Sequence, residues 1–270
     1  MDVRKYNSAM VDSYSVRTAA THASYILPRI KPDMKILDVG CGPGTITVDL
    51  ASRVPEGSVT GLDAGEMAIE KAKGTARERG IANVTFVLGD AFNLPFEDNT
   101  FDLVHCHQVL VHLPSHEGQP GPLKGLSEMR RVCKVGAIVC AKEAEWDSRV
   151  VFPKIPGVRE ALDLMLELSL HRSVVLHGCR MREFARKAGF EADKIEGSAS
   201  VTTYSGREQR EWAGENMAKR IESGNTKQKA LELGLATQEE VERMAPGWRE
   251  WAKHDDAFYS LTDAQIICFK

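Results

Sequence analysis

The chain has 270 residues and a mass of 29.8 kDa, which is enough to bury a real core and excludes a peptide hormone or a small disulfide-stapled scaffold. Its 35 Lys and Arg residues against 38 Asp and Glu residues give a formal net charge of −3, so no overall charge steers it toward nucleic acid or anionic lipid. A content of 43% hydrophobic and 27% charged residues is typical of a soluble globular protein.

Between residues 35 and 143, short apolar runs alternate with helical patterns, which favours a parallel sheet. The runs predict five strands, at 35–39, 58–63, 84–88, 101–105 and 137–141. Helices are predicted from the spacing of Ile46, Leu50 and Val54, over 67–79 before Gly80, and around Leu123, Leu126 and Met129. Right-handed crossovers place the carboxyl ends of the strands at one edge, where open α/β folds bind ligands. We therefore seek function at residues 38–44, 63, 90–92 and 105–112.

After residue 143 the pattern changes to charged helices with two further strands. Helices are predicted at 158–170 and 181–188, a strand at 195–204, mostly helical structure over 206–253 and a final strand at 264–270. Three tryptophans lie in the long helical segment, namely Trp212, Trp248 and Trp251. We expect them to pack between helices rather than to contact a ligand.

A glycine loop, Asp38-Val39-Gly40-Cys41-Gly42-Pro43-Gly44, joins the first strand to the first helix, the context in which such a motif is informative. A dinucleotide fingerprint reads G-x-G-x-x-G and presents a helix N-terminus to a pyrophosphate. Here the glycines fall at 40, 42 and 44, with Asp38 two residues before the first. An acid beside the loop suits an ammonium group better than a phosphate, which disfavours a nicotinamide dehydrogenase.

Two further acids follow strands at the same edge. Asp63 ends the second strand, where an acid accepts hydrogen bonds from ribose hydroxyls, and Asp90 follows the third strand in Gly89-Asp90-Ala91-Phe92. Strand-end acids with a glycine loop are consistent with an adenosine site that lacks a phosphate.

These segments carry a family resemblance. Ile36 to Gly44, Asp63, Gly89 to Phe92 and Phe101 to Leu113 resemble the successive motifs of class I S-adenosylmethionine-dependent methyltransferases, closest to the ubiquinone/menaquinone-biosynthesis-like branch. The resemblance implies an α/β fold: a Rossmann-like sheet with helices on both faces and helical insertions that form a substrate cap. It also implies S-adenosylmethionine as the cofactor.

The resemblance further assigns residues to that cofactor. It implies that Gly40 and Gly42 line the methionine moiety, with Asp38, Cys41 and Gly44 of the same loop also at the cofactor. It implies that Asp63 binds the ribose hydroxyls and that Asp90, with Ala91 or Phe92, reads the adenine.

In similar enzymes the segment before the first strand closes over the cofactor, and here it holds Tyr6, Tyr14, Arg17 and His22. Arg17 is a candidate partner for the methionine carboxylate, against the alternative of a solvated surface arginine, which its residue type favours. The expected organisation is therefore a helical lid at 1–34, a cofactor-binding core at 35–145, and a C-terminal half of the sheet with cap insertions at 146–270. The acceptor is expected between the lid and the insertions at 146–180 and 206–253.

Methyl transfer from a sulfonium mainly requires alignment of the acceptor, which is worth roughly 7–11 kcal/mol. A general base is needed only where the acceptor arrives protonated. His112 and His107 are the catalytic candidates, and His107 is also placed at the cofactor; a structural histidine is the alternative for each. If the fourth strand extends that far, His105 and His107 point to the same side.

A zinc site built from His105, His107, His112 and His116 is disfavoured, because Pro114 interrupts the segment and no H-E-x-x-H helix occurs. No metal is predicted. Nucleic acid is disfavoured by the charge and because His107-Gln108-Val109-Leu110 stands where a base-methylating enzyme would carry Asn/Asp-Pro-Pro-Tyr/Phe. We therefore expect a small organic acceptor.

The six cysteines include no C-x-x-C pair, which favours a reducing compartment. The polar first residues lead into no signal-peptide core, and no run of about eighteen apolar residues occurs, so we expect a cytoplasmic protein without membrane insertion. Two alternatives to methyl transfer stay open: the same fold used for a non-methylating step such as cyclisation, and a non-catalytic cofactor-binding protein. The acceptor atom and the oligomeric state are left unassigned.

Overall fold

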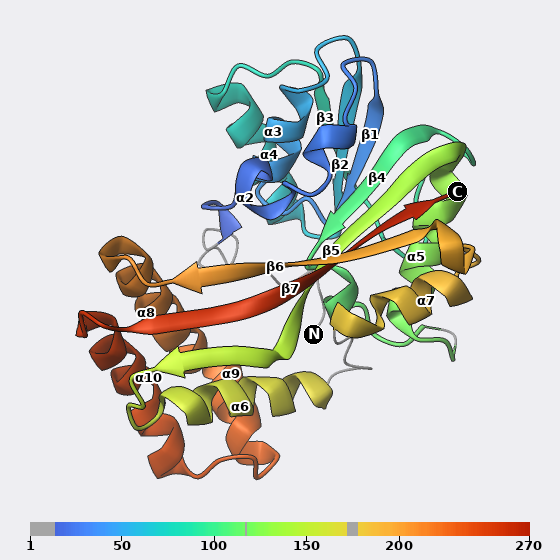
Figure 1. Ribbon diagram of the computed structural model, residues 1–270. Helices are drawn as coiled ribbons and strands as arrows, with labels where there is room; N and C mark the ends of the chain where they lie inside the picture. The colour runs from blue at the N-terminus through green and yellow to red at the C-terminus, as the bar shows by residue number, and fades with distance from the viewer. Residues whose placement is uncertain (1–13, 117, 172–177) are drawn as a thin grey trace. The chain divides into compact units, whose positions relative to one another are not determined.

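The computed structural model describes residues 14–116, 118–171 and 178–270, so Tyr6 lies outside the described residues. Its seven strands form one sheet in the order β3-β2-β1-β4-β5-β7-β6 (Figure 1). The strands are β1 Lys35–Val39, β2 Ser58–Asp63, β3 Val84–Leu88, β4 Phe101–His107, β5 Cys133–Phe152, β6 Ile195–Tyr204 and β7 Phe258–Phe269.

The first five strands pair as the sequence predicts. β1 pairs in parallel with both β2 and β4, β2 pairs in parallel with β3, and β4 pairs in parallel with β5. Their carboxyl ends therefore share one edge, and the α/β, Rossmann-like arrangement is confirmed.

Three strands are longer than their apolar runs suggested. β4 continues to His107, β5 extends at both ends, and β7 begins at Phe258 rather than at residue 264. Polar residues inside β5 explain why the run seemed to end early: Lys142 and Glu143 are only 1% and 0% exposed, so the strand stays buried where its sequence turns charged.

Helices cover both sides of the β1–β4 part of the sheet, with α3 and α4 on one side and α5 and α7 on the other (Figure 1). The α-helices are α2 Ala19–His22, α3 Thr45–Ala51, α4 Glu66–Glu78, α5 Gly121–Val132, α6 Val158–Leu170, α7 Met181–Lys187, α8 Arg207–Glu222, α9 Gly224–Glu232 and α10 Gln238–Lys253. Short 3₁₀ helices are η1 Leu27–Arg29, η2 Leu110–His112, η3 Gly178–Arg180 and η4 Ala192–Lys194. Within the described ranges, no helix has both the length and the apolar character needed to cross a membrane.

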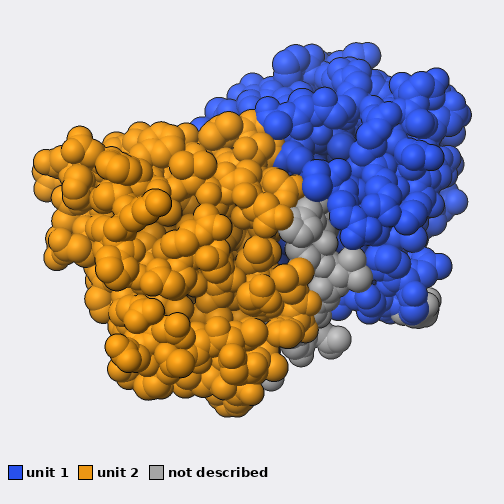
Figure 2. Space-filling model, turned by 60° about the horizontal axis from the view of Figure 1, so that its bottom comes forward, with its two compact units in different colours: residues 1–143, 176–199, 264–270 blue, residues 144–175, 200–263 orange. Residues whose placement is uncertain are grey.

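The chain divides into two compact units, coloured separately in Figure 2. The first comprises residues 1–143, 176–199 and 264–270, and the second comprises residues 144–175 and 200–263. The chain therefore passes from one unit to the other within β5, β6 and β7. The division into a lid at 1–34, a core at 35–145 and a cap at 146–270 remains a prediction.

The first unit packs α2 and α3 against the sheet. Buried Ile46 and Leu50 of α3 meet Ile36 and Leu103 of the neighbouring strands β1 and β4. This apolar layer fixes the direction of β1 and therefore the place where the glycine loop leaves the sheet.

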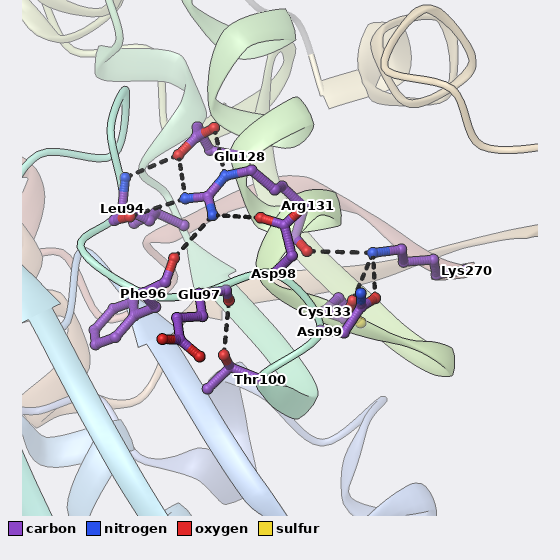
Figure 3. A network of polar contacts seen from close by, with 10 residues as sticks. All are labelled: Leu94, Phe96, Glu97, Asp98, Asn99, Thr100, Glu128, Arg131, Cys133 and Lys270. Atoms are coloured by element: carbon purple, nitrogen blue, oxygen red, sulfur yellow. Dashed lines mark hydrogen bonds and ion pairs between the residues drawn. The ribbon is translucent and has the colours of Figure 1, made fainter.

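An arginine on α5 ties the connection between β3 and β4 to that helix (Figure 3). Arg131 donates to the carbonyl oxygens of Leu94 and Phe96, at 2.9 and 2.8 Å, and to the carboxylates of Glu128 and Asp98. Because residues 90–92 lie on the same connection, this network holds in place one of the segments predicted to contact the cofactor.

The second unit has its own core, built around fully buried Trp248 and Trp251 of α10. Trp212 of α8 packs against the same cluster and stacks on Tyr204 of β6, so the three tryptophans belong to one hydrophobic core. Gly214 permits the close approach of α8 to α10, since a Cβ at that position would lie 2.7 Å from the carbonyl oxygen of Trp248.

Candidate active site

A cavity of about 690 Å³ opens at the carboxyl ends of the strands of the first unit. All the described residues that line it belong to that unit. Those predicted from the sequence are Arg17, Asp38, Gly40, Cys41, Gly42, Asp63, Asp90, Ala91, Phe92, His107 and His112. The structure thus brings together nearly all of the predicted site residues, and Gly44 is the exception.

The glycine loop needs its glycines for two different reasons. Gly40, Gly42 and Gly44 all have positive φ angles, of 69°, 54° and 78°, which glycine adopts without strain. A Cβ at Gly40 would also lie 2.3 Å from Val109, whereas a Cβ at Gly44 would lie 2.7 Å from Ala72 of α4. Gly44 therefore serves the packing of α3 on α4, and its contact with a cofactor stays a prediction.

Asp63 anchors the glycine loop from β2. Its Oδ2 accepts the N–H of Gly42 at 2.9 Å, and its Oδ1 accepts the N–H of Gly65 at 2.9 Å. Burial raises the pKa of the Asp63 carboxyl, while the backbone N–H groups of Gly65 and Gly42 act in the opposite direction. Each carboxylate oxygen keeps capacity for a further donor, such as a ligand hydroxyl.

Asp38 also lines the cavity, but both of its oxygens already have partners in the protein. Thr47 Oγ1 donates to Oδ2 at 2.6 Å, and His105 Nδ1 donates to Oδ1 at 2.8 Å. His105 is fully buried behind Asp38 and is not one of the lining residues. Asp38 therefore links β1 to β4 and α3 in addition to facing the cavity.

Asp90, Ala91 and Phe92 form the wall beyond β3. Asp90 Oδ1 accepts the N–H of Phe92 at 2.9 Å, which folds the segment into a tight turn. The Phe92 ring stacks on His116, with centroids 4.6 Å apart and planes 11° apart. The wall thus offers an acid next to a flat aromatic surface, which suits a planar ring with amino donors.

The two histidines considered for catalysis both line the cavity, but their surroundings differ. His107 ends β4 and receives a long hydrogen bond, 3.4 Å, from Arg17 Nη1 to its Nδ1. Burial first, and then the positive charge of Arg17, lower the pKa of His107 well below its ordinary value, so this imidazole is neutral near pH 7. His112 lies at the end of η2, a turn further along.

Arg17 lies at the same end of the cavity. Its Nη2 donates to Gln108 Oε1 at 2.8 Å, and its guanidinium carbon lies 4.3 Å from the centre of the Tyr14 ring. The site thus has acids toward β2 and β3 and a cation near the end of β4.

Sequence reasoning missed two residues that shape this end of the site. Gln108 has a positive φ of 52°, and no sequence pattern predicts this conformation for a glutamine. Glu143 lies on β5, and its Oε1 accepts the N–H groups of Val109 and Leu110 at 2.9 and 2.8 Å. The available signal for Glu143 was an acid two residues beyond the apolar run at 137–141, near the end of a predicted strand as Asp63 is.

In the described part of the chain, no three His, Cys, Asp or Glu side chains are arranged to hold a metal ion. The four histidines considered for a zinc site have separate surroundings. They are His105, His107, His112 and His116. His105 pairs with Asp38, and His116 stacks on Phe92.

Comparison with known proteins gives consistent results. A family model described as "Methyltransferase domain" matches residues 30–175. A Schizosaccharomyces pombe protein named "Uncharacterized methyltransferase" is 35% identical over 268 residues, which is 97% of this chain and 93% of that protein. "Demethylmenaquinone methyltransferase" of Staphylococcus aureus is 38% identical over 127 residues, covering 47% of this chain and 49% of that protein.

Among solved structures, phosphoethanolamine N-methyltransferase 2 of Haemonchus contortus, in complex with S-adenosyl-L-methionine, matches with a TM-score of 0.59 at 19% identity. The match covers 99% of this chain and 58% of that chain. At this identity the match shows a shared fold.

Proposed function

Since the chain belongs to the methyltransferase-domain family, we propose that it is a class I S-adenosylmethionine-dependent methyltransferase acting on a small organic metabolite. One observation carries the proposal: the Asp63-anchored glycine loop, the Asp90–Phe92 wall and Arg17 all face one cavity at the carboxyl ends of the strands. These groups match the chemistry of a cofactor with a ribose, an adenine and an amino acid part.

The backbone leaves room for such a cofactor. A Cβ at Gly42 would meet no atom within 4 Å, so the loop presents open backbone to the cavity. Asp63 would accept the ribose hydroxyls and the Asp90–Phe92 wall would hold the adenine. Arg17 would pair with the carboxylate of the methionine part. When bound, the cofactor supplies an electrophilic methyl group on a sulfonium.

The residues beyond the cofactor align the acceptor and accept its proton. His107 is a weak base because its pKa is depressed by burial and by Arg17, so we assign it the role of a neutral hydrogen-bonding group. We assign the role of general base, where the acceptor arrives protonated, to His112, which lines the same cavity.

The acceptor class extends the proposal further. The Staphylococcus aureus relative is named for a demethylmenaquinone acceptor, and the motif resemblance points to the same quinone-biosynthesis branch. That match covers less than half of the chain. We therefore propose a small organic acceptor and treat a quinone precursor as the first compound to assay.

Calorimetric titration with S-adenosylmethionine and S-adenosylhomocysteine tests the cofactor assignment. We expect the wild type to bind both ligands and Asp63→Ala to lose about tenfold or more in affinity, because the ribose acceptor is removed. Asp102→Ala is the matched control: this acid is the second residue of β4, at the opposite end of the strand from the cavity, and pairs with Lys134 at 2.7 Å. It should bind both ligands as the wild type does.

Acceptors are then screened with a labelled methyl group. Transfer of the label to a small molecule supports the proposal. Cofactor binding without any methylated product would favour a non-methylating step such as cyclisation, and no binding of either ligand to the wild type would refute the cofactor assignment itself.

A further inference from the structure

Gln108, directly after β4, has an unusual backbone conformation for its residue type. Its φ of 52° lies in the left-handed region, which glycine adopts freely and which Asn and Asp tolerate better than glutamine does. Such strain persists only where the surrounding structure imposes it, and it concentrates at functional sites. Gln108 lines the candidate active-site cavity.

The turn itself does not depend on the glutamine side chain. The N–H of Gln108 donates to the carbonyl oxygen of Lys142 at 2.8 Å, and the next two N–H groups donate to Glu143 Oε1. Both partners are buried residues of β5. Because β5 fixes the turn through the backbone, glycine at position 108 would make the same turn with less strain, and the reason for a glutamine must lie in its side chain.

That side chain holds Arg17. Gln108 Oε1 accepts the hydrogen bond of Arg17 Nη2 at 2.8 Å, while Tyr14 covers one face of the guanidinium and His107 Nδ1 faces Nη1. All four residues line the cavity. An amide fixes the direction of the guanidinium without neutralising it, whereas a carboxylate at position 108 would form an ion pair with Arg17 and compete with an anionic ligand.

We infer that Gln108 is a positioning residue that aims the guanidinium of Arg17 at the carboxylate of S-adenosylmethionine. The inference rests on the proposed function, because the carboxylate belongs to the proposed cofactor. The left-handed backbone is what brings an uncharged acceptor within reach of Arg17 from the end of β4.

The test compares two ligands by calorimetry on the full chain. S-adenosylhomocysteine carries the carboxylate, and 5′-methylthioadenosine has the same adenosine and sulfur without it. For Gln108→Gly we expect an approximately tenfold weaker affinity for S-adenosylhomocysteine, unchanged affinity for methylthioadenosine, and a melting temperature no lower than that of the wild type. Gln108→Glu should also lower the affinity for S-adenosylhomocysteine and leave the affinity for methylthioadenosine unchanged, because the new carboxylate would form an ion pair with Arg17.

Asn99→Gly is the matched control. In the described part of the chain, Asn99 and Gln108 are the two non-glycine residues with a positive φ, and the φ of Asn99 is 55°. Asn99 does not line the cavity. Both ligands should therefore bind this variant as they bind the wild type. In an Arg17→Met background, Gln108→Gly should cause no further loss, since Gln108 acts through Arg17.

The inference is overturned if Gln108→Gly binds S-adenosylhomocysteine like the wild type, or if it weakens both ligands equally. In either case the wild type still binds, and the proposed function stands. If the wild type binds neither ligand, the proposed function fails and the inference fails with it.

Discussion

His107 shows how burial and a neighbouring charge set the protonation state of one side chain. Its imidazole lies at the end of β4, edge-on to His22 with ring centroids 5.1 Å apart and next to Arg17. Both burial and the cation disfavour a second proton, and the pKa of His107 is therefore lowered. A second positive charge is thus kept away from Arg17 at this end of the cavity.

This depressed pKa makes the folded state sensitive to acid. Below about pH 6.5 the unfolded chain binds a proton at His107 that the native chain does not, so the free energy of unfolding falls as the pH falls, by up to about 1.4 kcal/mol per pH unit from this group. His107→Gln should remove that contribution. Urea unfolding at pH 7.5 and 5.5 measures it as the difference in slope between wild type and variant.

His254→Gln, at an exposed position, is the control and should keep the wild-type slope. Equal acid sensitivity in the wild type and His107→Gln would show that His107 is protonated in the native protein, which would also remove the reason for preferring His112 as the base.

At the scale of single residues, the sequence predicts which acids belong to the site, but it does not predict an unusual backbone conformation. Asp63 and Asp90 were identified because acids at the carboxyl ends of parallel strands lie at one edge of the sheet. Gln108 escaped because its importance comes from a φ angle imposed by β5, and the partners that impose it lie 34 residues away in the sequence. Its contact with Arg17, 91 residues away, is equally invisible to local patterns.

Among the elements, the connection between β3 and β4 is held to α5 by the side chain of one arginine. Arg131 of α5 satisfies two carbonyl oxygens of that connection and the nearly buried carboxylate of Glu128 (Figure 3). Hydrogen bonding to Glu128 and Asp98 raises the pKa of Arg131, so the guanidinium stays charged at any pH at which the protein is folded. The loop is thus fastened to a helix rather than to its own strands.

Arg131→Met should therefore lower the free energy of unfolding by about 2 kcal/mol, since it leaves two carbonyl oxygens without their donor and leaves Glu128 with only the N–H of Leu94. Urea denaturation measures the change. Arg79→Met is the control: Arg79 forms an exposed ion pair with Asp49 at 2.6 Å, and its loss should cost less than about 1 kcal/mol. A similar small effect for both variants would mean that solvent replaces the Arg131 network.

The element boundaries show a second limit of sequence reasoning. The first three strands were predicted at their observed bounds, because each is a short apolar run that ends in a turn. β5 and β7 were predicted too short, because both carry buried polar residues, such as Lys142, Glu143 and Asp263, that resemble strand ends in an apolar pattern. A buried charge that has hydrogen-bond partners elsewhere in the fold breaks the pattern without breaking the strand.

For the molecule as a whole, the division into two units predicts which residues a bound cofactor protects from hydrogen exchange. Within the described ranges, every residue that lines the cavity belongs to the first unit. Saturating S-adenosylhomocysteine should stabilise the fold by mass action, by about 2.7 kcal/mol at a hundredfold excess over Kd. Hydrogen exchange should slow in residues 38–44, 62–65, 88–92 and 107–113, and much less in α8 and α10. Slowing confined to the helices of the second unit would place the cofactor elsewhere.

The strand order β5-β7-β6 has a consequence for how the protein is made. β5 and β6 are synthesised before β7, yet β7 lies between them in the sheet. One edge of β5 and one edge of β6 therefore stay unpaired until β7 has been synthesised. Unpaired strand edges are open to pairing with other molecules while they wait. Protection by chaperones during synthesis, and slow refolding from dilute solution, are therefore expected to matter more for this chain than its ordinary composition suggests.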